Sequence, residues 1–565
     1  MIKNRIKKLR EKFNKHNIDG YIVPKNGEFF SEYTKNDRLK FISNFTGSAG
    51  YGVILKNRNY LFVDGRYTIQ AQVESANNFN IVDYNKIINC NLFKNLQLGI
   101  DPKLFTNLQI KRFFSKNNKI KIINLNLIDY LSKTKKVNSK PFFSISNKIV
   151  GESYKNKINK IQKFMLKNKS DYIFITAPEN IAWILNIRGH DNPNSPIPNC
   201  HLILDKQKTI YIIVERKKVK YLIKERKIKK NNIIEPKKFQ DFIKSLKGKK
   251  IQIDEKTCSA YHENIINKKF KILGKEDPIY ILKSIKNKNE IQNMIDCHIS
   301  DGIALTKFLY WIKNINKKDI TEFEAQTKLE NFRKKNKNYL YPSFNTIAGS
   351  GSNGAIVHYK ATKNKTKKIE KEDIFLCDSG GQYKYGTTDV TRTICFSRPK
   401  KSIKNIFTRV LKGHIAVAEI NLKENFMGKL IDLAARKYLK KINLDYAHGT
   451  GHGVGFFSNV HEGPQAISKY NKVKICEGMI LSNEPGFYKK GEYGIRIENL
   501  IYVKKNKNKL FFKNLTLAPI DNDLIDFNQL NKKEKNYLLK YNILIYSKLH
   551  KFLNKNERKW LASNF

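Results

Sequence analysis

The sequence predicts a multidomain protein of the α/β and α+β classes, with two α/β segments followed by a larger α+β segment. Three observations predict this organisation. The chain has 565 residues, which is too long for one ordinary domain. Helix and strand patterns alternate through its first half, and the cycle restarts after Ser144. Beyond Glu290, long helical patterns are mixed with strands that read as hairpins.

The first α/β segment begins with a helix predicted at Ile2–Lys15, where apolar residues recur every three or four positions. Short apolar strands are predicted after it at Gly20–Pro24, Tyr51–Leu55, Tyr60–Val63 and Leu98–Asp101. This order of elements is typical of an α/β layer structure.

The second segment repeats the cycle. A helix is predicted at Tyr154–Lys167, followed by strands at Asp171–Thr176, His201–Leu204, Ile210–Val214 and Ile251–Asp254. No residue-level repeat relates the two segments, so we expect a duplication of architecture only.

The α+β segment follows the polar, basic stretch Lys283–Asn289, which is typical of a linker. A long helix is predicted at Glu290–Lys313 from its apolar period of 3.6 residues. All plausible catalytic residues lie between this helix and about Tyr502, and the tail Asp521–Phe565 is predicted to be mostly helical.

The chain is strongly basic: 108 Lys and Arg against 50 Asp and Glu give a formal charge of +58. Such a charge alone indicates a nucleic-acid or anionic-membrane binder. The lysines are scattered, however, and no zinc-finger spacing, basic-region heptad or aromatic RNA-binding motif accompanies them. We interpret the charge mainly as a solvated surface with compositional bias, and expect no specific nucleic-acid partner and no membrane partner.

The cysteines indicate a reducing compartment. Seven are spread singly and none forms a CxxC pair, which argues against a disulfide framework or a cysteine zinc site. The first residues lack the apolar core of a signal peptide, and no apolar run is long enough to cross a bilayer. We therefore expect a cytoplasmic protein.

Two facing carboxylates are predicted in the first hairpin, IFLCDSGGQYKYGTTDVTRTICF (Ile374–Phe396). A turn centred on Tyr383–Lys384 would set Asp378 opposite Asp389. Side chains so placed have Cβ atoms roughly 4.5–5.5 Å apart. Two carboxylates this close repel unless a cation or a proton lies between them.

A second hairpin, SNEPGFYKKGEYGIRIENL, has the same geometry. A turn centred on Gly491 sets Glu484 opposite Glu498. Arg496 shares the face of Glu498, while Ile495 and Ile497 point the other way. Packing alone does not explain a strand that turns Glu and Arg inward.

Histidines in glycine-rich loops accompany the hairpins. HGTGHGVGFFSNVHEGP lies between them and contains His448, His452 and His461, and glycines on both sides of His452 leave room for a metal or ligand. GSGSNG at Gly349–Gly354 matches the nucleotide-binding pattern GxGxxG. It is expected before a strand at Ala355–Tyr359 and not between a strand and a helix, so nucleotide binding is disfavoured. We interpret it as the loop that presents His358.

Together these residues predict a two-metal centre formed by Asp378, Asp389, His452, Glu484 and Glu498. Singly, such features are more often a solvated turn or a salt bridge; two matched hairpins in one domain are not explained that way. Four carboxylates and one histidine suit Mn²⁺, and tolerate Co²⁺ or Zn²⁺. Carboxylates can bridge two divalent metal ions about 3.5–4 Å apart, and such a pair would hold a hydroxide at neutral pH and polarise a substrate carbonyl.

The motifs themselves resemble a known family. GSNGAIVHYKAT, DSGGQYKYGTTDVTRT, HGTGHGVG, VHEGP, NEPGFY and GIRIEN resemble, in order and spacing, the long three-domain form of aminopeptidase P (Xaa-Pro aminopeptidase) of peptidase family M24. DRLKFISNFTGSAG, LFVDGRYTIQAQ, ENIAWILNIRG and LTLAPID extend the resemblance over essentially the whole chain.

The resemblance implies two creatinase-like α/β domains and a pita-bread catalytic domain. We place the creatinase-like domains at 1–146 and 147–285, the catalytic domain at 286–510 and a C-terminal extension at 511–565. It also implies a homodimer that releases the first residue from peptides with proline second.

It further implies residue roles within the metal centre. Asp378 would bind one metal, Asp389 and Glu498 would bridge both, and His452 and Glu484 would complete the other.

The remaining site residues receive roles by chemistry and likeness. His358 and His461 would stabilise the tetrahedral intermediate or relay a proton. His448 would line the substrate pocket, and Arg496 would orient Asp378. Xaa-Pro dipeptidase (prolidase) or creatinase chemistry on the same fold, and a non-catalytic binding module of that fold, remain alternatives.

Overall fold

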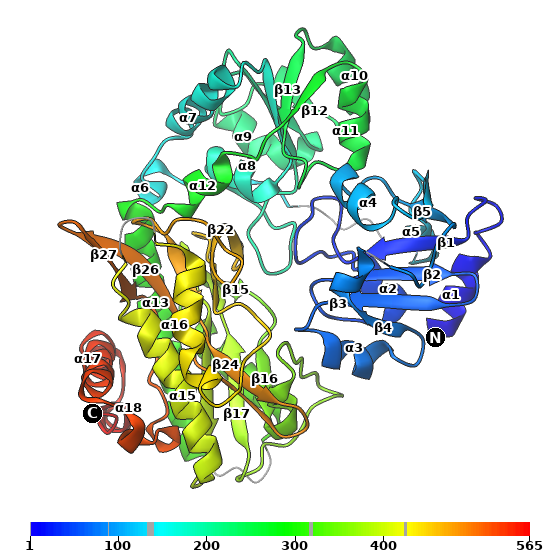
Figure 1. Ribbon diagram of the computed structural model, residues 1–565. Helices are drawn as coiled ribbons and strands as arrows, with labels where there is room; N and C mark the ends of the chain where they lie inside the picture. Colours follow the sequence, from blue (N-terminus) through cyan, green and yellow to red (C-terminus); the bar gives the residue numbers. More distant parts are fainter. Residues whose placement is uncertain (1, 89, 133–139, 316–319, 423–425) are drawn as a thin grey trace. The chain divides into compact units, whose positions relative to one another are not determined.

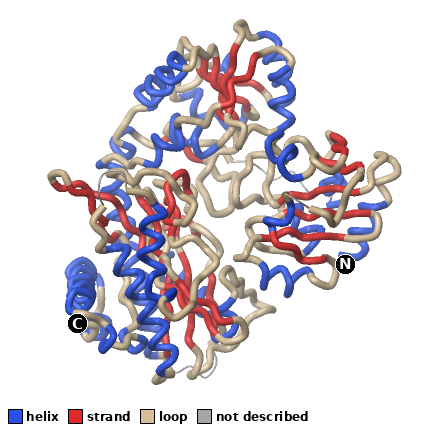
Figure 2. The backbone as a smooth tube through the Cα atoms, viewed as in Figure 1, coloured by secondary structure: helices blue, strands red, loops and turns tan. Residues whose placement is uncertain are grey.

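The computed structural model describes residues 2–88, 90–132, 140–315, 320–422 and 426–565. The chain forms two compact units, Met1–Ile279 and Tyr280–Phe565 (Figure 1). The first unit contains two six-stranded sheets, and the second combines long helices with several smaller sheets (Figure 2).

The first sheet of the N-terminal unit has the order β4-β3-β2-β1-β5-β6. Its strands, in chain order, are Gly20–Pro24, Tyr51–Leu55, Asn59–Val63, Asn80–Asp83, Gln97–Ile100 and Lys119–Ile122. The first three strands pair antiparallel, and the outer pairs and β1–β5 are parallel. Apolar clusters lie on both faces; helices α1 (Ile2–Arg10), α2 (Arg38–Ser43) and α5 (Leu127–Ser132) contribute to one of them.

The second sheet has the order β12-β11-β10-β8-β13-β14. Its strands, in chain order, are Tyr172–Ile175, His201–Asp205, Ile210–Ile213, Ile233–Ile234, Lys250–Ile253 and Lys271–Gly274. When each set is counted in chain order, both sheets read 4-3-2-1-5-6, and their parallel and antiparallel pairs correspond. The predicted duplication of architecture is confirmed.

Helix α7 spans Tyr154–Lys167 as predicted, whereas α1 ends at Arg10, five residues early. The outer strands β4, β6, β12 and β14 were not predicted. These edge strands are short, and three of them contain no fully buried residue. Their apolar signal is correspondingly weak.

The C-terminal unit is built around α13 (Lys288–Asn314), α14 (Glu322–Lys334), α15 (Lys401–Ala418) and α16 (Gly428–Lys440). The Asn287 side chain and Glu290 form a capping box that fixes the start of α13. Figure 1 shows α15 and α16 side by side near the strands that follow. The tail forms α17 (Lys532–Leu549) and α18 (Lys555–Ala562), as predicted.

Three sheets of this unit position the candidate site. Strands β16 (Ile347–Ser350), β17 (Ile374–Ser379) and β20 (Val390–Cys395) form one sheet. The second contains β21 (Gly451–Gly453), β22 (Glu462–Ile467), β23 (Ile480–Asn483), β26 (Asn499–Asn506) and β27 (Lys509–Asn514). The third is the hairpin β24 (Gly486–Lys489) and β25 (Tyr493–Arg496).

Two predictions about the connecting segments need correction. Lys283–Asn289 lies within the C-terminal unit, from the end of α12 (Ile279–Ser284) to the start of α13, and Lys283 and Lys286 are buried, so it is not a solvated linker. Ala355–Tyr359 is not a strand: residues Gly351–Ala355 form the 3-10 helix η5 and a turn follows.

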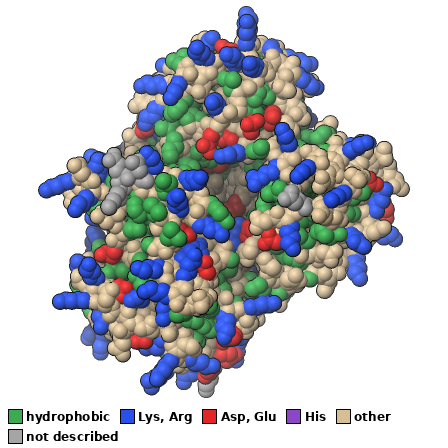
Figure 3. Space-filling view, in the orientation of Figure 1, with side chains coloured by type: hydrophobic (Ala, Val, Ile, Leu, Met, Phe, Trp, Pro, Cys, Tyr) green, Lys and Arg blue, Asp and Glu red, His purple; other side chains and the backbone are tan. Residues whose placement is uncertain are grey.

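The composition agrees with a protein covered by scattered lysines. Figure 3 shows Lys and Arg side chains spread over the visible face, with Asp and Glu between them. All seven cysteines are free, and six of them are buried. Within the described ranges no helix is both long and apolar enough to span a bilayer.

Candidate metal centre

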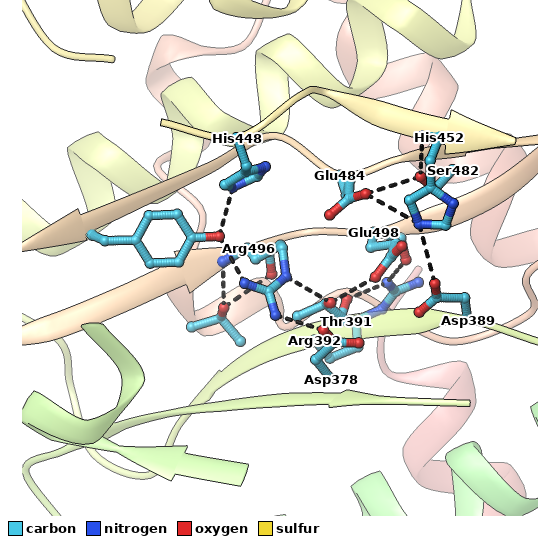
Figure 4. A network of polar contacts seen from close by, with 12 residues as sticks. Asp378, Asp389, Thr391, Arg392, His448, His452, Ser482, Glu484, Arg496 and Glu498 are labelled. Atoms are coloured by element: carbon cyan, nitrogen blue, oxygen red, sulfur yellow. Dashed lines mark hydrogen bonds and ion pairs between the residues drawn. The ribbon is translucent and has the colours of Figure 1, made fainter. Parts of the chain in front are cut away.

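The five predicted ligands come from the ends of strands that meet in the C-terminal unit (Figure 4). Asp378 lies on β17, and Asp389 immediately precedes β20. His452 is the middle residue of β21. Glu484 directly follows β23, and Glu498 lies between β25 and β26.

The register of the second hairpin agrees with its prediction. Gly486 pairs with Arg496 in β24–β25, and Asn483 pairs with Asn499 in β23–β26. The two ladders have the same register, and Glu484 and Glu498 occupy the interval between them. They therefore face each other where the ladder is interrupted. Ile495 and Ile497 are buried in the helical core, so the alternation of faces is also as predicted.

The register of the first hairpin differs from its prediction by two residues. Asp378 pairs with Thr391, not with Asp389. The strands between them, β18 (Gly381–Tyr383) and β19 (Gly386–Thr387), belong to another sheet, formed with β15 (Tyr339–Pro342). A shift of two residues leaves every side chain on its original face, so Asp389 still reaches the site.

His452 completes a set of donor atoms suited to a metal. Its Nε2 lies 3.5 Å from Asp389 Oδ2 and 3.5 Å from Glu484 Oε1. One donor atom each from Asp389, His452 and Glu498 lies within 4.8 Å of the others. Nδ1 of His452 is 2.9 Å from the Gly453 carbonyl oxygen, which can only accept a hydrogen. The Nδ1–H therefore donates there, and Nε2, which faces the carboxylates, is the atom left to bind a ligand.

The electrostatics of the carboxylates fit a cation-binding site. Burial raises the pKa of Asp378; Arg496 opposes the rise, and the charges of Asp389 and Glu484 add to it, so that the pKa reaches about 7. Burial and the three neighbouring carboxylates raise the pKa of Glu498 well above its usual range. Burial also raises the pKa of Glu484, against the charges of His452 and Arg496.

Burial lowers the pKa of His452, but the hydrogen bond to Asp389 and the charge of Glu484 outweigh burial and raise it to about 9. Asp378 Oδ1 is buried and accepts no hydrogen bond from the described residues. A cluster of like charges with an unsatisfied buried oxygen needs positive charge between its members. The residues present fit a pair of divalent cations.

Arg496 fixes the orientation of the Asp378 carboxylate through its Oδ2 atom. One guanidinium nitrogen donates to Asp378 Oδ2 at 2.6 Å, and another donates to the Tyr488 hydroxyl at 2.7 Å. Nε donates to the Thr391 hydroxyl at 3.0 Å. Arg496 is only 2% exposed, so these bonds fix both the charge and the geometry of Asp378.

Tyr488 was missed by the sequence analysis. Its hydroxyl accepts from Arg496 and lies 2.8 Å from His448 Nε2. His448 Nδ1 is 2.8 Å from the Gly449 carbonyl, so Nδ1 carries the hydrogen and Nε2 accepts from Tyr488. Tyr488 thus joins the predicted pocket histidine to the arginine. The signal was in the NEPGFY motif, where a tyrosine two residues beyond Gly486 shares its strand face.

Two hydroxyl residues that the sequence analysis also missed support the ligands. Thr391 donates to Glu498 Oε2 at 2.7 Å. Ser482 donates to Glu484 Oε1 at 2.9 Å and accepts from the backbone N–H of His452 at 2.9 Å. These contacts limit the orientations of both glutamates.

His461 lies beside the ligand histidine: the rings of His452 and His461 are T-shaped, with centroids 4.3 Å apart. The next residue, Glu462, forms buried ion pairs with Lys286 at 2.5 Å and Lys283 at 3.2 Å. The first residues of the C-terminal unit are thereby joined to the start of β22, directly after His461.

His358 lies in the turn after η5 and is half-buried. η5 packs against β17 and β25, the strands of Asp378 and Arg496. The structure thus brings the His358 loop against the candidate site, in a turn and not in the predicted strand.

A second acidic cluster has its own counter-ion. Cys395, Asp521 and Asp523 place donor atoms within 4.8 Å of one another. The Lys313 ammonium lies 3.0 Å from Asp521 and 2.7 Å from Asp523, and donates to the Cys395 carbonyl. This cluster is explained as an ion-pair network.

Four family descriptions match successive parts of the chain. They are Creatinase/Prolidase N-terminal domain at residues 5–128 and again at 133–290, Metallopeptidase family M24 at 292–505, and C-terminal region of peptidase_M24 at 508–564.

Similar proteins extend over the whole chain. Xaa-Pro aminopeptidase 1 of Dictyostelium discoideum is 34% identical over 100% of this chain and 96% of its own length. The crystal structure of X-prolyl aminopeptidase from Caenorhabditis elegans, described as a cytosolic enzyme with a di-nuclear active site, superposes with a TM-score of 0.92. It is 29% identical, and the match covers 100% of this chain and 99% of that one. Prolidase from Pyrococcus furiosus is 28% identical with a TM-score of 0.51, and covers 63% of this chain and 98% of its own.

The chain therefore belongs to the aminopeptidase P family within metallopeptidase family M24. The predicted fold class, two creatinase-like domains followed by a pita-bread domain, is confirmed. Family membership and the di-nuclear relative also support a site for two divalent metals.

Proposed function

We propose that the chain is a metal-dependent aminopeptidase that hydrolyses the first peptide bond of substrates with proline in second position. The observation that carries the proposal is the cluster of four carboxylates and His452 in a chain that matches X-prolyl aminopeptidase over its full length. The matched prolidase covers only 63% of this chain, so the dipeptidase alternative leaves more than a third of it unexplained.

The five ligands divide into two sets in this proposal. Asp389 and Glu498 would contribute ligands to both cations, Asp378 would complete one set, and His452 and Glu484 would complete the other. Mn²⁺ is the proposed ion, with Co²⁺ and Zn²⁺ as alternatives, because the ligands are mostly oxygen. When bound, two such ions supply a hydroxide at neutral pH and positive charge for the oxygen of the attacked carbonyl.

The chain's own residues provide orientation and proton transfer. Arg496 holds Asp378 Oδ2 and so leaves Oδ1 for coordination. His461, whose ring adjoins that of His452, and His358 donate to the carbonyl oxygen or move a proton to the leaving amine. His448 lines the substrate side and is held by Tyr488.

Selectivity for proline has a physical basis in the substrate. A Xaa-Pro bond has no N–H, and the ring restricts the preceding residue. Peptidases that need that N–H as a hydrogen-bond donor lose a contact, whereas a site that does not use it accepts proline.

We also propose the wider organisation. The domain boundaries are 1–146, 147–285, 286–510 and 511–565, supported by the repeated sheet topology and by the positions of the matched families. The chain is cytoplasmic, which the free cysteines support, and it forms a homodimer. Its charge serves no specific nucleic acid or membrane, so any DNA binding should be lost at physiological salt.

A substrate panel tests the proposed function. Peptides that vary residues one to three are incubated with protein loaded separately with Mn²⁺, Co²⁺ or Zn²⁺, and released residues are identified. Cleavage should require proline second and a third residue. Turnover of Xaa-Pro dipeptides or creatine alone would instead assign the prolidase or creatinase alternative.

A further inference from the structure

A buried glutamate outside the metal centre organises the loop that carries His358. Glu322 is the first residue of α14 and is 0% exposed. Its Oε1 accepts from the Ser350 N–H at 2.7 Å and from the Asn353 side chain at 3.0 Å. Its Oε2 accepts from the Tyr359 hydroxyl at 2.8 Å and from the Lys367 N–H at 2.8 Å. Each of these donors is a neutral N–H or O–H group.

Three of the four donors lie in one segment, which we define as the histidine loop, Gly349–Tyr359. This loop contains the end of β16, η5 and the turn with His358, and Tyr359 is the next residue after that histidine. Glu322 therefore accepts hydrogen bonds from both ends of the loop, at Ser350 and Tyr359, and from its middle, at Asn353.

The histidine loop is in turn fitted closely to the metal centre. η5 packs against β25 and β17. A Cβ atom at Gly494 of β25 would lie 1.8 Å from the Gly354 carbonyl oxygen, so the two backbones touch. Displacement of the loop would thus move His358 relative to the strands of Asp378 and Arg496.

Helix capping does not account for Glu322. The helix begins with a complete capping box: Thr321 accepts from the Glu324 N–H, and Glu324 accepts from the Thr321 N–H. The Glu322 carboxylate is instead directed entirely at the histidine loop and Lys367. Burying a carboxylate is costly unless hydrogen bonds satisfy it, and here several donors converge on its two oxygens.

We propose that Glu322 is a positioning residue that holds the histidine loop in the conformation in which His358 acts on the substrate. The proposal rests on the proposed function and on the role assigned to His358. A carboxylate is required because it only accepts hydrogen bonds. A glutamine would turn its NH₂ group against donors in either orientation of the amide.

Two substitutions on the same helical turn provide the test. Glu322→Gln keeps the shape of the side chain and should lower kcat about 10²-fold, the cost of a misplacement of roughly 1 Å. KM and metal content should stay close to those of the unmodified chain. The matched control is Glu324→Gln, which alters an exposed glutamate of the capping box and should leave kcat within about twofold.

A double-mutant cycle separates positioning from general damage. In a His358→Ala background, Glu322→Gln should cause no further loss of kcat, because the positioned group is gone. A second full loss in that background would overturn the proposal. If Glu322→Gln does not fold, Tyr359→Phe is the substitute test, because it removes one donor to Glu322 without burying a new polar group. It should lower kcat by less than the fall expected for Glu322→Gln.

Hydrogen exchange supplies a measurement that does not depend on activity. Amides of the histidine loop should exchange faster in Glu322→Gln than in Glu324→Gln. Equal exchange, or equal kcat in the two variants, would overturn the positioning role. Absence of Xaa-Pro cleavage by the unmodified, metal-loaded chain would instead refute the proposed function, so the two failures are distinguishable.

Discussion

In the chain without divalent cations, the free energy of unfolding of the C-terminal unit should fall as pH rises. The reason is that the folded chain holds protons on groups that the unfolded chain ionises. The pKa of Asp378 is raised from 3.8 to about 7 by burial and by Asp389 and Glu484, against the opposing charge of Arg496. The stabilisation from its protonated form is complete below 3.8 and is lost as pH rises through about 7.

The magnitude follows from the two pKa values. The difference between 3.8 and about 7 corresponds to about 4 kcal/mol of unfolding free energy. Glu484 and Glu498 shift in the same direction. The pKa of His452, raised to about 9, has the same sign: its stabilisation is present below 6.5 and is lost as pH rises through about 9.

The assay is calorimetry of chelator-treated protein between about pH 5 and about pH 8. Between these two pH values the titration of Asp378 alone lowers the free energy of unfolding by about 2.5 kcal/mol, because part of the loss occurs below pH 5. Such a loss lowers the transition temperature by roughly 5–10 °C in a unit of this size. The formal charge of +58 predicts the opposite trend, because general repulsion eases as histidines lose their protons. Protein loaded with Mn²⁺ should show a much smaller slope, because cations replace the protons.

Two variants test the assignment to the site. Asp378→Asn should flatten the dependence of transition temperature on pH in the chelated protein. Asp523→Asn, at an exposed residue, should leave that dependence unchanged. A transition temperature that is flat or rises with pH in the chelated chain would refute the reasoning, as would an unchanged slope in Asp378→Asn.

Three further substitutions are informative. Glu498→Ala should abolish peptide cleavage and lower the metal content per chain measured by mass spectrometry; normal turnover would contradict the bridging role. Tyr488→Phe removes the hydroxyl between the arginine and the pocket histidine, and should lower kcat/KM about 10-fold without loss of metal; unchanged kinetics would exclude that role. Lys286→Met leaves the buried Glu462 one cation short and should destabilise the chain by about 3–5 kcal/mol in calorimetry, unlike Lys469→Met at the surface; equal stability of these two would show that the ion pair contributes little.

The sequence predicted the second carboxylate hairpin because its register depends on local features. The turn at Gly491 has a positive φ of 79°, and strand alternation separates the inward Glu498 from the buried Ile497. The inserted strands β18 and β19 pair with β15, which lies outside the hairpin's own sequence. No local pattern reveals that partner, so the predicted register of the first hairpin was wrong by two residues.

The contacts missed by the sequence analysis are long-range. Lys286 and Glu462 are 176 residues apart, and their pairing leaves no periodic trace in the chain. Basic residues in a polar stretch are usually solvated, which is why Lys283–Asn289 was interpreted as a simple linker. The role of Glu322 was likewise not predictable from the sequence, because its hydrogen bonds join a helix start to a loop about 30 residues away.

The repeated α/β architecture was predictable to the extent that its strands are buried. Central strands such as β1 and β10 are buried at every residue and produce continuous apolar runs. The edge strands β4 and β6 have no fully buried residue and resemble loops in sequence.

Titration of Mn²⁺ into the metal-free chain, with release of arginine from Arg-Pro-Pro followed at each loading, tests the central claim most directly. Release should rise as the site fills towards two ions per chain, and the dipeptide Arg-Pro should remain intact. A metal-loaded chain that leaves Arg-Pro-Pro intact while it hydrolyses Arg-Pro would contradict the assignment.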